Sequence, residues 1–302
     1  MKNFIKRTLP SIHREYLTQR YGINRLAVEK KLSSLTERGV EESQHKVIVS
    51  LTSYGDRIND IHLTIFSLLV QTYKPNRILL WLTANEYPNR ELDLPDSLLS
   101  LKNLGLEVKW CNDYKSYNKL IPALLEFPEY TIVTADDDVF YAKDWLKKLF
   151  DSYVEFPHYI HTHKASKVRH LKNSSFDRYT NWEDALPGSV SYKNFLKGVS
   201  GVLYPPRSLH IDATRSDIFL SLSPYADDVW FWSMAVLNKV KVKVIKDNIS
   251  SHRYTNVGRE LGGLSKTLHE INVQGGRNDS QLMNVLLYYP QINNILLAEY
   301  QI

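Results

Sequence analysis

The sequence lacks the features that mark secreted, membrane-spanning and cysteine-based metal proteins. Its 302 residues include one cysteine, Cys111, which excludes an internal disulfide and a zinc site built on several cysteines. No apolar run approaches the roughly 20 residues that a helix needs to cross a bilayer. Phe4 and Ile5 form too short an apolar stretch for a secretory signal. We therefore expect a protein of a reducing compartment, the cytoplasm.

Internal repeats and low-complexity segments are also missing. Hydrophobic residues make up 43% of the chain and charged residues 24%, as in an ordinary globular protein. A chain of this length can bury a substantial core in one large domain or two small ones. A fibrous or largely disordered protein is thereby excluded.

The positive charge is concentrated at the N-terminus. Residues 1–38 contain nine Lys or Arg against three Glu, whereas the whole chain has a net charge of only +5. Such an arm can hold the protein on an anionic membrane, at roughly 1 kcal/mol per basic residue near the surface. Alternatively, it packs on the body of the protein or on a neighbouring subunit of a homo-oligomer. We expect no nucleic-acid partner, because no nucleic-acid-binding motif accompanies the charge.

The same arm has the sequence features of a helix. Leucines recur near helical spacing between Asn24, which suits an N-cap, and Gly39, which suits a helix stop. We therefore expect residues 1–44 to form a basic helical arm that precedes a domain at 45–302.

From residue 46 onward, strand-like runs alternate with helical periodicity. Strands are predicted at 46–54, 76–83, 106–111 and 130–138, and helices at 58–71, 96–105, 117–127 and 143–156. This alternation predicts an α/β fold with a mixed, mainly parallel sheet flanked by helices. In such sheets, ligands bind beyond the carboxyl ends of the strands.

The second half of the domain is more irregular. Residues 158–198 mix short strands with polar and aromatic loops, which suits a region that faces the substrate. Further elements are predicted as strands at 201–206 and 240–245 and as helices at 223–239 and 281–289. We expect 45–150 to bind the nucleotide and 151–302 to form the acceptor side and the C-terminal extension.

Three consecutive carboxylates, Asp136, Asp137 and Asp138, end the fourth predicted strand. An acidic turn would account for them, since Asp is a common turn former. However, the spacing of Asp136 and Asp138 also lets two carboxylates face one hard cation such as Mg²⁺ or Mn²⁺. That ion would neutralise the acids and stabilise the negative charge of a departing nucleotide.

Several stretches resemble GT-A fold glycosyltransferases with a DXD motif, of the bacterial capsule and lipopolysaccharide type (family 2-like). They are, in this order, "VIVSLTSYGDR", "YNKLIPALLEFPEYTIVTADDDVFY", "KGVSGVLYPP", "ADDVWFW" and "GRNDSQ", and together they cover most of residues 46–286. The resemblance implies a Rossmann-like GT-A fold that transfers a sugar from a nucleotide-sugar donor to a glycan or lipid-linked acceptor. It also implies Mn²⁺ or Mg²⁺ as cofactor and favours a UDP-sugar.

The resemblance assigns roles to particular residues. The residues expected to bind the donor are Thr52, Ser53, Tyr54, Asp56, Arg57, Lys115, Lys119, Asp136, Asp137, Gly201 and Arg253. The residues expected to bind the metal are Asp136, Asp138 and His252. Asn278 and Asp279, with Arg253, are expected in a loop that closes over the diphosphate. Purely structural roles are equally open to some of them: "SYGD" suits a turn, lysines are common on surfaces, and Gly198 and Gly201 suit either close approach to the sugar or turns.

The acids of "ADDVWFW" are the expected catalytic residues. In an inverting transferase a carboxylate deprotonates the acceptor hydroxyl, and the resemblance gives this role to Asp228, with Asp227 beside it. Helix capping would explain one of the two acids, and in a retaining enzyme Asp228 would orient the donor instead. Trp230 and Trp232 on the same helix serve either the core or sugar stacking.

Different functional classes match the sequence less well. His161, His163 and His170 have no acidic companions, so we interpret them as acceptor-region or surface residues and not as a zinc site. A sugar nucleotidyltransferase would need a Gly-rich loop with Lys or Arg after the first strand, which "LTSYGDR" matches poorly. A non-catalytic glycan-binding module is disfavoured by the intact acids at 136, 138 and 228.

Overall fold

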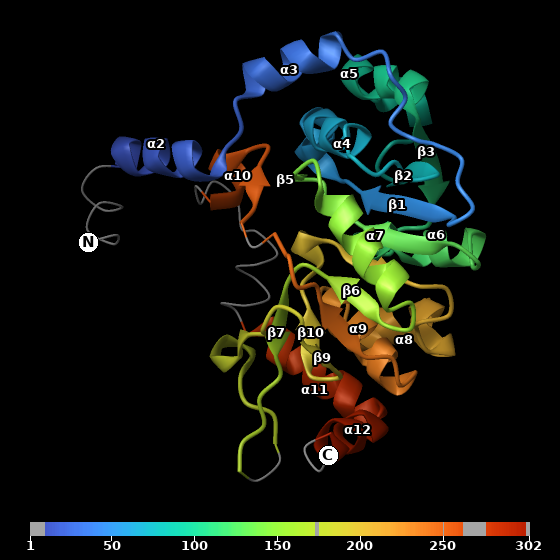
Figure 1. The fold of residues 1–302 in the computed structure, drawn as a ribbon, viewed down its shortest axis with the longest axis vertical. Helices are drawn as coiled ribbons and strands as arrows, with labels where there is room; N and C mark the ends of the chain where they lie inside the picture. Colours follow the sequence, from blue (N-terminus) through green and yellow to red (C-terminus); the bar gives the residue numbers. More distant parts are fainter. Residues whose placement is uncertain (1–9, 173–174, 250, 262–275, 300–302) are drawn as a thin grey trace.

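The computed structural model describes residues 10–172, 175–249, 251–261 and 276–299. In this part of the chain, an eight-stranded sheet has the order β3-β2-β1-β4-β11-β6-β12-β9 (Figure 1). Its strands, in that order, are Leu106–Cys111, Arg77–Thr83, Val47–Thr52, Thr131–Thr134, Val202–Tyr204, Ile160–Thr162, Val242–Val244 and Val190–Ser191. Strands pair in parallel from β3 to β4 and between β6 and β12, whereas β11 and β9 run antiparallel to their neighbours. The predicted mixed sheet is therefore confirmed.

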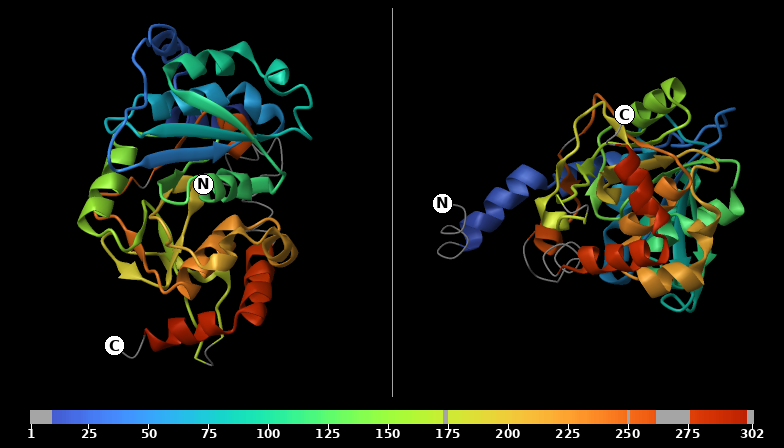
Figure 2. Two further views of the ribbon diagram at one scale, coloured as in Figure 1. Left: turned by 90° about the vertical axis from the view of Figure 1, so that its right-hand side faces the viewer. Right: turned by 90° about the horizontal axis from the view of Figure 1, so that it is seen from below.

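Helices cover both faces of this sheet (Figure 2). They are α4 (Ile61–Leu69), α5 (Asp96–Leu99), α6 (Ile121–Glu126), α7 (Trp145–Glu155), α8 (Ser216–Leu222), α9 (Asp227–Leu237), α11 (Arg277–Tyr288) and α12 (Gln291–Ala298). Successive side chains of a strand point to opposite faces. Val47 and Val49 of β1 therefore pack with α4 and α7, whereas Ile48 packs with α6 and α9. The sheet thus separates two apolar cores.

Most predicted elements are found where the sequence placed them, although their ends differ. The strand predicted at 106–111 coincides with β3, whereas the helix predicted at 58–71 divides into the 3₁₀ helix η1 (Gly55–Asn59) and α4. Two helices, α8 and α12, were not predicted. Short helices with few polar positions offer little periodicity, which explains both omissions.

Two smaller sheets flank the central one. Their strands are β7 (Ala165–Lys167), β8 (Glu183–Asp184) and β10 (Asn194–Leu196) in one, and β5 (Val139–Phe140) and β13 (Arg253–Tyr254) in the other. The antiparallel β5–β13 ribbon joins the segment after the acidic triplet to the C-terminal part of the chain. Strands of two residues carry no periodic signal, so the sequence could not predict this ribbon.

The N-terminal arm forms two helices and not one. Asn24 caps α3 (Arg25–Ser33) as predicted, because its side chain accepts a hydrogen bond from the Ala27 amide at 3.1 Å. The stop predicted at Gly39 is wrong, since α3 ends at Ser33. Gly39 instead lies against α4, where a Cβ atom would come within 2.5 Å of the Leu69 Cα atom. Residues 1–9 of the predicted arm lie outside the described residues.

The first helix of the arm, α2 (Pro10–Tyr21), extends away from the body (Figures 1 and 2). The second, α3, lies over α4, and its buried Val28 packs with Leu63 and Phe66 of that helix. The two helices of the arm therefore differ, because only α3 contributes to an apolar cluster with the body.

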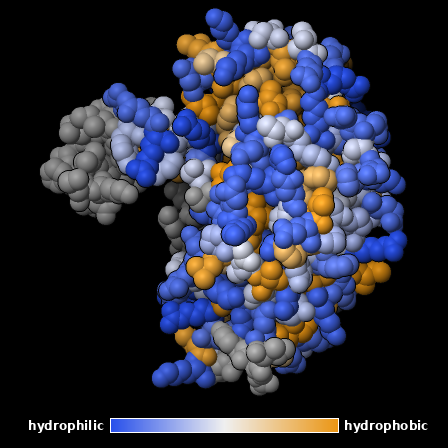
Figure 3. Space-filling view, viewed as in Figure 1, coloured by the Kyte–Doolittle hydropathy of each residue, from blue (hydrophilic) through white to orange (hydrophobic). Residues whose placement is uncertain are grey.

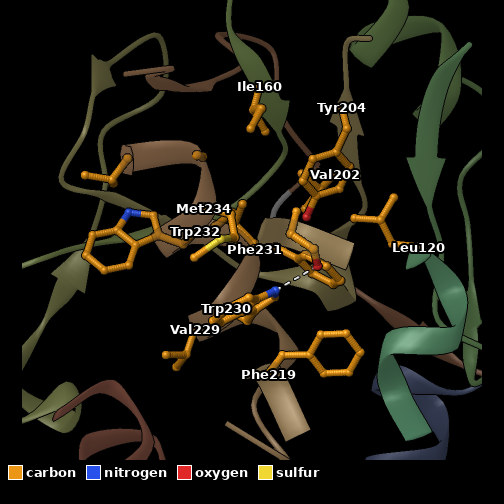
Figure 4. Packing of buried hydrophobic residues seen from close by; sticks show 14 of the residues in the cluster. Leu120, Ile160, Val202, Tyr204, Phe219, Val229, Trp230, Phe231, Trp232 and Met234 are labelled. Atoms are coloured by element: carbon orange, nitrogen blue, oxygen red, sulfur yellow. Dashed lines mark hydrogen bonds between the residues drawn. The ribbon is translucent and has the colours of Figure 1, made fainter. Parts of the chain in front are cut away.

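Two predicted surface roles are corrected by burial. Trp230 and Trp232 are both 0% exposed and pack among apolar side chains around α9 (Figure 4), so neither can stack on a sugar. His161 and His163 are also 0% exposed. Nε2 of His163 lies 3.0 Å from the Trp145 carbonyl oxygen, and its Nδ1 accepts the Ile249 amide at 3.1 Å. Both histidines are satisfied core residues, not acceptor contacts, while His170 is partly buried with Nε2 3.3 Å from the Asn293 side chain.

Candidate active site

The acidic triplet lies at the carboxyl end of β4, next to the loop that follows the parallel strand β1. The hydroxyl of Ser53, directly after β1, donates a hydrogen bond of 2.6 Å to Oδ2 of Asp137. Asp137 is buried, and its backbone carbonyl oxygen accepts the Thr64 hydroxyl at 2.9 Å. The fold thus brings together the two segments that the sequence assigned to the nucleotide sugar.

Arg57 holds two acids of the triplet. Its Nη1 lies 3.1 Å from Oδ1 of Asp137 and 2.8 Å from Oδ2 of Asp138, and its Nη2 lies 2.9 Å from Glu260. Burial alone would lower the pKa of Arg57, but the three carboxylates raise it above its ordinary value. Arg57 therefore stays cationic and neutralises part of the charge that the triplet concentrates.

Lys119 links the first acid of the triplet to the acidic start of α9. Its buried Nζ lies 2.9 Å from Oδ1 of Asp136 and 3.0 Å from Oδ2 of Asp227. Burial disfavours the ammonium, but the charges of Asp136, Asp227 and Asp228 hold the pKa of Lys119 well above its usual range. One ammonium therefore joins the predicted donor side to the predicted acceptor side.

Asp228 is held by the backbone of the 3₁₀ helix η6 (Gly198–Ser200). The Gly198 amide donates to both carboxylate oxygens of Asp228, at 3.1 and 3.0 Å. A Cβ atom on Gly198 would come within 2.6 Å of Oδ1 of Asp228. Burial and the charge of Asp227 raise the pKa of Asp228 to about 7, against the opposing effect of Lys119. Asp228 therefore changes its charge near neutral pH, which suits a general base.

The donor atoms near the triplet fit a hard divalent ion. The buried Oδ1 of Asp138 has no hydrogen-bond partner among the described residues. Burial and the charge of Asp137 raise the pKa of Asp138 well above its usual range, so a bound cation would relieve a real penalty. Burial lowers the pKa of His252 to about 4, which leaves a neutral imidazole able to bind a metal.

The predicted metal ligands are not gathered into a ready-made cage. Nε2 of His252 lies 3.1 Å from the Ser200 hydroxyl, while Asp136 and the second oxygen of Asp138 meet Lys119 and Arg57. Across the described ranges there is no cluster of three or more His, Cys, Asp or Glu side chains arranged to hold a metal ion.

Solved structures that resemble the chain include a mannosyltransferase from Pyrobaculum calidifontis in complex with GDP-Man and Mn²⁺. It aligns with a TM-score of 0.50 over 99% of this chain and 81% of its own, at 12% sequence identity. S. aureus TarS aligns with a TM-score of 0.43 at 15% identity, over 80% of this chain and 70% of its own. The inositol-1-phosphate CTP transferase of T. maritima gives 0.41 at 12% identity, over 68% and 86%. No protein-family model and no curated protein matches the sequence.

The fold is GT-A-like. This conclusion depends on the mixed central sheet and on the likeness to the mannosyltransferase, which at this identity shows the fold alone. Within the GT-A-like fold, the acids of the candidate site lie beyond the carboxyl end of a parallel strand, where such sheets bind ligands.

The other residues of the loop after β1 line the same end of the GT-A-like sheet. The hydroxyl of Thr52 donates to the Trp81 carbonyl oxygen at 2.8 Å. The side chain of Tyr54 is 55% exposed, and the Arg57 guanidinium carbon lies 5.8 Å from the centre of its ring. Asp56 is exposed beside it in η1. The exposed ring of Tyr54 is therefore available to a planar base.

Several predicted site residues have partners elsewhere. Gly201 packs against the Trp145 ring, the Arg253 guanidinium donates to the Gly22 carbonyl oxygen of the arm at 3.1 Å, and Oδ1 of Asp279 accepts the Tyr179 amide at 2.7 Å. The exposed Lys115 lies with Nζ 4.1 Å from the centre of the Tyr225 ring, and Asn278 lies in the first turn of α11. The structure thus brings Ser53, Arg57, Lys119 and the acids together, but not these five residues.

Two residues of the site were not predicted. Glu260, on the short helix α10 (Val257–Leu261), shares Arg57 with the triplet. The Tyr141 hydroxyl oxygen accepts the Asp136 amide at 2.8 Å. Tyr141 ends the quoted "TADDDVFY" stretch, so its nearness in sequence could have suggested a role, whereas nothing in the pattern near Glu260 indicates its partner.

Proposed function

We propose that this chain is a nucleotide-sugar-dependent glycosyltransferase. It transfers a sugar, from a UDP-sugar in our preferred form, to a glycan or lipid-linked acceptor in bacterial surface polysaccharide synthesis, with inversion. The observation that carries the proposal is Lys119, which joins Asp136 at the end of β4 to the Asp227 and Asp228 pair at the start of α9. In a GT-A-like fold this arrangement places two acidic groups on opposite sides of one reaction centre.

The donor half of the proposal uses the loops after β1 and β4. The exposed ring of Tyr54 stacks on the nucleotide base, and the Thr52 and Ser53 segment contacts the ribose. Arg57 and Lys119 supply positive charge near the diphosphate while they keep the carboxylates in place. Asp137, whose two oxygens already accept Ser53 and Arg57, positions this loop.

The metal of the proposal is Mn²⁺ or Mg²⁺, with Asp136, Asp138 and His252 as its ligands. The unpartnered Oδ1 of Asp138 and the neutral imidazole of His252 support this assignment. When bound, the ion supplies the positive charge that stabilises the departing nucleoside diphosphate. The likeness to a mannosyltransferase solved with GDP-Man and Mn²⁺ supports this choice of cofactor and leaves the nucleotide to experiment.

The acceptor half of the proposal uses Asp228. Its carboxylate takes the proton of the acceptor hydroxyl while that oxygen bonds to the anomeric carbon and the bond to the diphosphate oxygen breaks. The Gly198 amide fixes the carboxylate, and Asp227 keeps its pKa near neutral pH. In the retaining alternative Asp228 orients the donor and accepts no proton.

A donor screen tests the proposal. We expect hydrolysis of one member of a panel of UDP- and GDP-sugars in the presence of Mn²⁺, and faster transfer when an acceptor is added. NMR of the product anomer then distinguishes inversion from retention. If neither hydrolysis nor transfer occurs with metal across the panel, the chain is a glycan-binding module and the proposal fails.

A further inference from the structure

A cavity of about 740 Å³ lies between the arm and the GT-A-like body. Its walls come from α3, α4 and the β5–β13 ribbon, and they are mainly apolar. Val28, Phe66, Val70, Val139 and Phe140 form most of this apolar surface. On the face seen in Figure 3, hydrophobic residues gather beside α3 and α4. The volume falls within the range of roughly 300–1,000 Å³ that is usual for ligand pockets.

The charges that line this groove are all positive. Lys31, Lys143 and Arg253 line it, and no Asp or Glu is among the described lining residues. None of the three forms an ion pair with a carboxylate in the part of the chain that the structure describes. Apolar walls with unpaired cations match a ligand that has an apolar chain and an anionic group.

The groove reaches the candidate active site. Its inner wall includes Trp145, Ser200 and His252, and the Ser200 hydroxyl lies 3.1 Å from Nε2 of His252. Ser200 belongs to η6, whose Gly198 amide holds Asp228. A ligand seated in the groove would therefore lie behind the segment that positions the proposed base and one proposed metal ligand.

We propose that the groove binds a single-chain lipid phosphate. The chain lies along the wall formed by α3, α4 and β5, and the phosphate lies among Lys31, Lys143 and Arg253. Burial of an alkyl chain contributes roughly 0.8 kcal/mol per methylene in general, and Arg pairs well with phosphate oxygens. Residues 1–9, which carry Lys and Arg but no acid, would bring like charge to the same cations. This inference depends on the proposed function only in assigning the lipid to the acceptor.

Calorimetry on the full chain with dodecyl phosphate, below its micellar concentration, tests the site. We expect dodecyl phosphate to bind at least about tenfold tighter than dodecanol or inorganic phosphate, because one charge-assisted contact is worth that factor. Equal affinity for dodecanol would show that the cations take no part, and the proposal would fail.

Two matched pairs of variants on α3 locate the binding. Ala27 and Lys31 line the groove, whereas the exposed neighbours Leu26 and Lys30 do not. We expect Ala27→Trp and Lys31→Glu to weaken dodecyl phosphate binding about tenfold or more, and Leu26→Trp and Lys30→Glu to leave it within about twofold. All four positions are exposed, so the variants should fold, which thermal melting checks.

The outcomes separate this proposal from the proposed function. Equal effects within each pair would place the ligand elsewhere, and no binding at all would show that another segment fills the groove; either result overturns the lipid site. Nucleotide binding with Mn²⁺, measured on the same four variants, should not change. If nucleotides fail to bind while the lipid pattern holds, the transferase proposal fails and the lipid site stands.

Discussion

The ionisation of Asp228 controls the proposed reaction at the scale of single residues. Burial and the charge of Asp227 raise its pKa to about 7, so the carboxylate gains its charge as the pH rises through neutrality. We expect kcat/KM to rise between about pH 6 and about pH 8, and Asp228→Asn to lower kcat by about 10²- to 10⁴-fold while nucleotide affinity is kept. Initial rates and nucleotide titrations measure both.

Asp227→Asn provides the control for this profile. Removal of the neighbouring charge should lower the pKa of Asp228 and move the rise in rate to lower pH. A profile that is flat through neutrality, or near-normal turnover in Asp228→Asn, would point to the retaining alternative.

The second prediction at this scale concerns Asp138. Asp138→Asn removes the charge beside the unpartnered Oδ1, so we expect Mn²⁺-dependent nucleotide affinity to fall about tenfold or more. Titration of the nucleotide with and without Mn²⁺ measures this effect. Asp151→Asn, on the exposed face of α7, should change nothing. Unchanged affinity in Asp138→Asn would refute its role as a metal ligand.

Gly201 shows at the scale of elements how β11 is fitted to α7. Its φ is +87°, and a Cβ atom there would come within 2.3 Å of the Trp145 ring. Gly188 has a φ of +82° but no atom within 4 Å of such a Cβ. We expect Gly201→Ala to lower the free energy of unfolding by about 1–3 kcal/mol more than Gly188→Ala, because only the first adds a clash to backbone strain. Denaturant unfolding of both variants tests this, and equal losses would contradict it.

The arm gives a second prediction at the scale of elements. Since α3 packs on α4 and lines the groove, a deletion that tests membrane binding should spare it. Deletion of residues 1–21 removes five of the nine basic residues before position 39. We expect weaker sedimentation with anionic vesicles, at roughly 1 kcal/mol per basic residue near the surface, and unchanged activity without vesicles.

Neutral vesicles are the control for the deletion. They should bind the full chain and the shortened chain equally weakly. If the deletion leaves anionic-vesicle binding unchanged, the arm serves packing or assembly instead. No helix in the described ranges is long and apolar enough to cross a membrane.

Lys119 joins the two halves of the domain at the scale of the whole molecule. In Lys119→Met, the buried Asp136 and Asp227 lose their shared cation, a change that typically costs about 3–5 kcal/mol. The acids escape this cost when they are protonated, so we expect the loss of stability to be larger at about pH 8 than at about pH 5. Thermal melts at both pH values measure it.

Lys115→Met is the matched control for Lys119→Met. Lys115 lies in the same 3₁₀ helix, η4 (Lys115–Lys119), but is exposed. It should change the melting temperature little at either pH. A pH-independent loss in Lys119→Met would show that packing, and not charge, explains the role of Lys119.

The sequence indicated the electrostatic problem of the candidate site but not all of its solution. Three adjacent acids after a strand require compensation, and the sequence suggested a divalent ion and a diphosphate. In the structure, Arg57 and Lys119 already compensate much of that charge, and only Oδ1 of Asp138 is left without a hydrogen-bond partner among the described residues of the triplet. Both cations were predicted as site residues, yet their pairing with the acids depends on contacts between distant segments.

Local patterns in the sequence determined the alternating strands and helices, the cap at Asn24 and the position of the acids at a strand end. These features follow from spacing within a few residues, which the backbone geometry of each element fixes. Tertiary structure alone decided that Glu260 shares Arg57, that Trp230 and Trp232 are buried, and that α3 encloses a groove. The reason is physical: such contacts join residues far apart in the chain, and packing, not periodicity, chooses their partners.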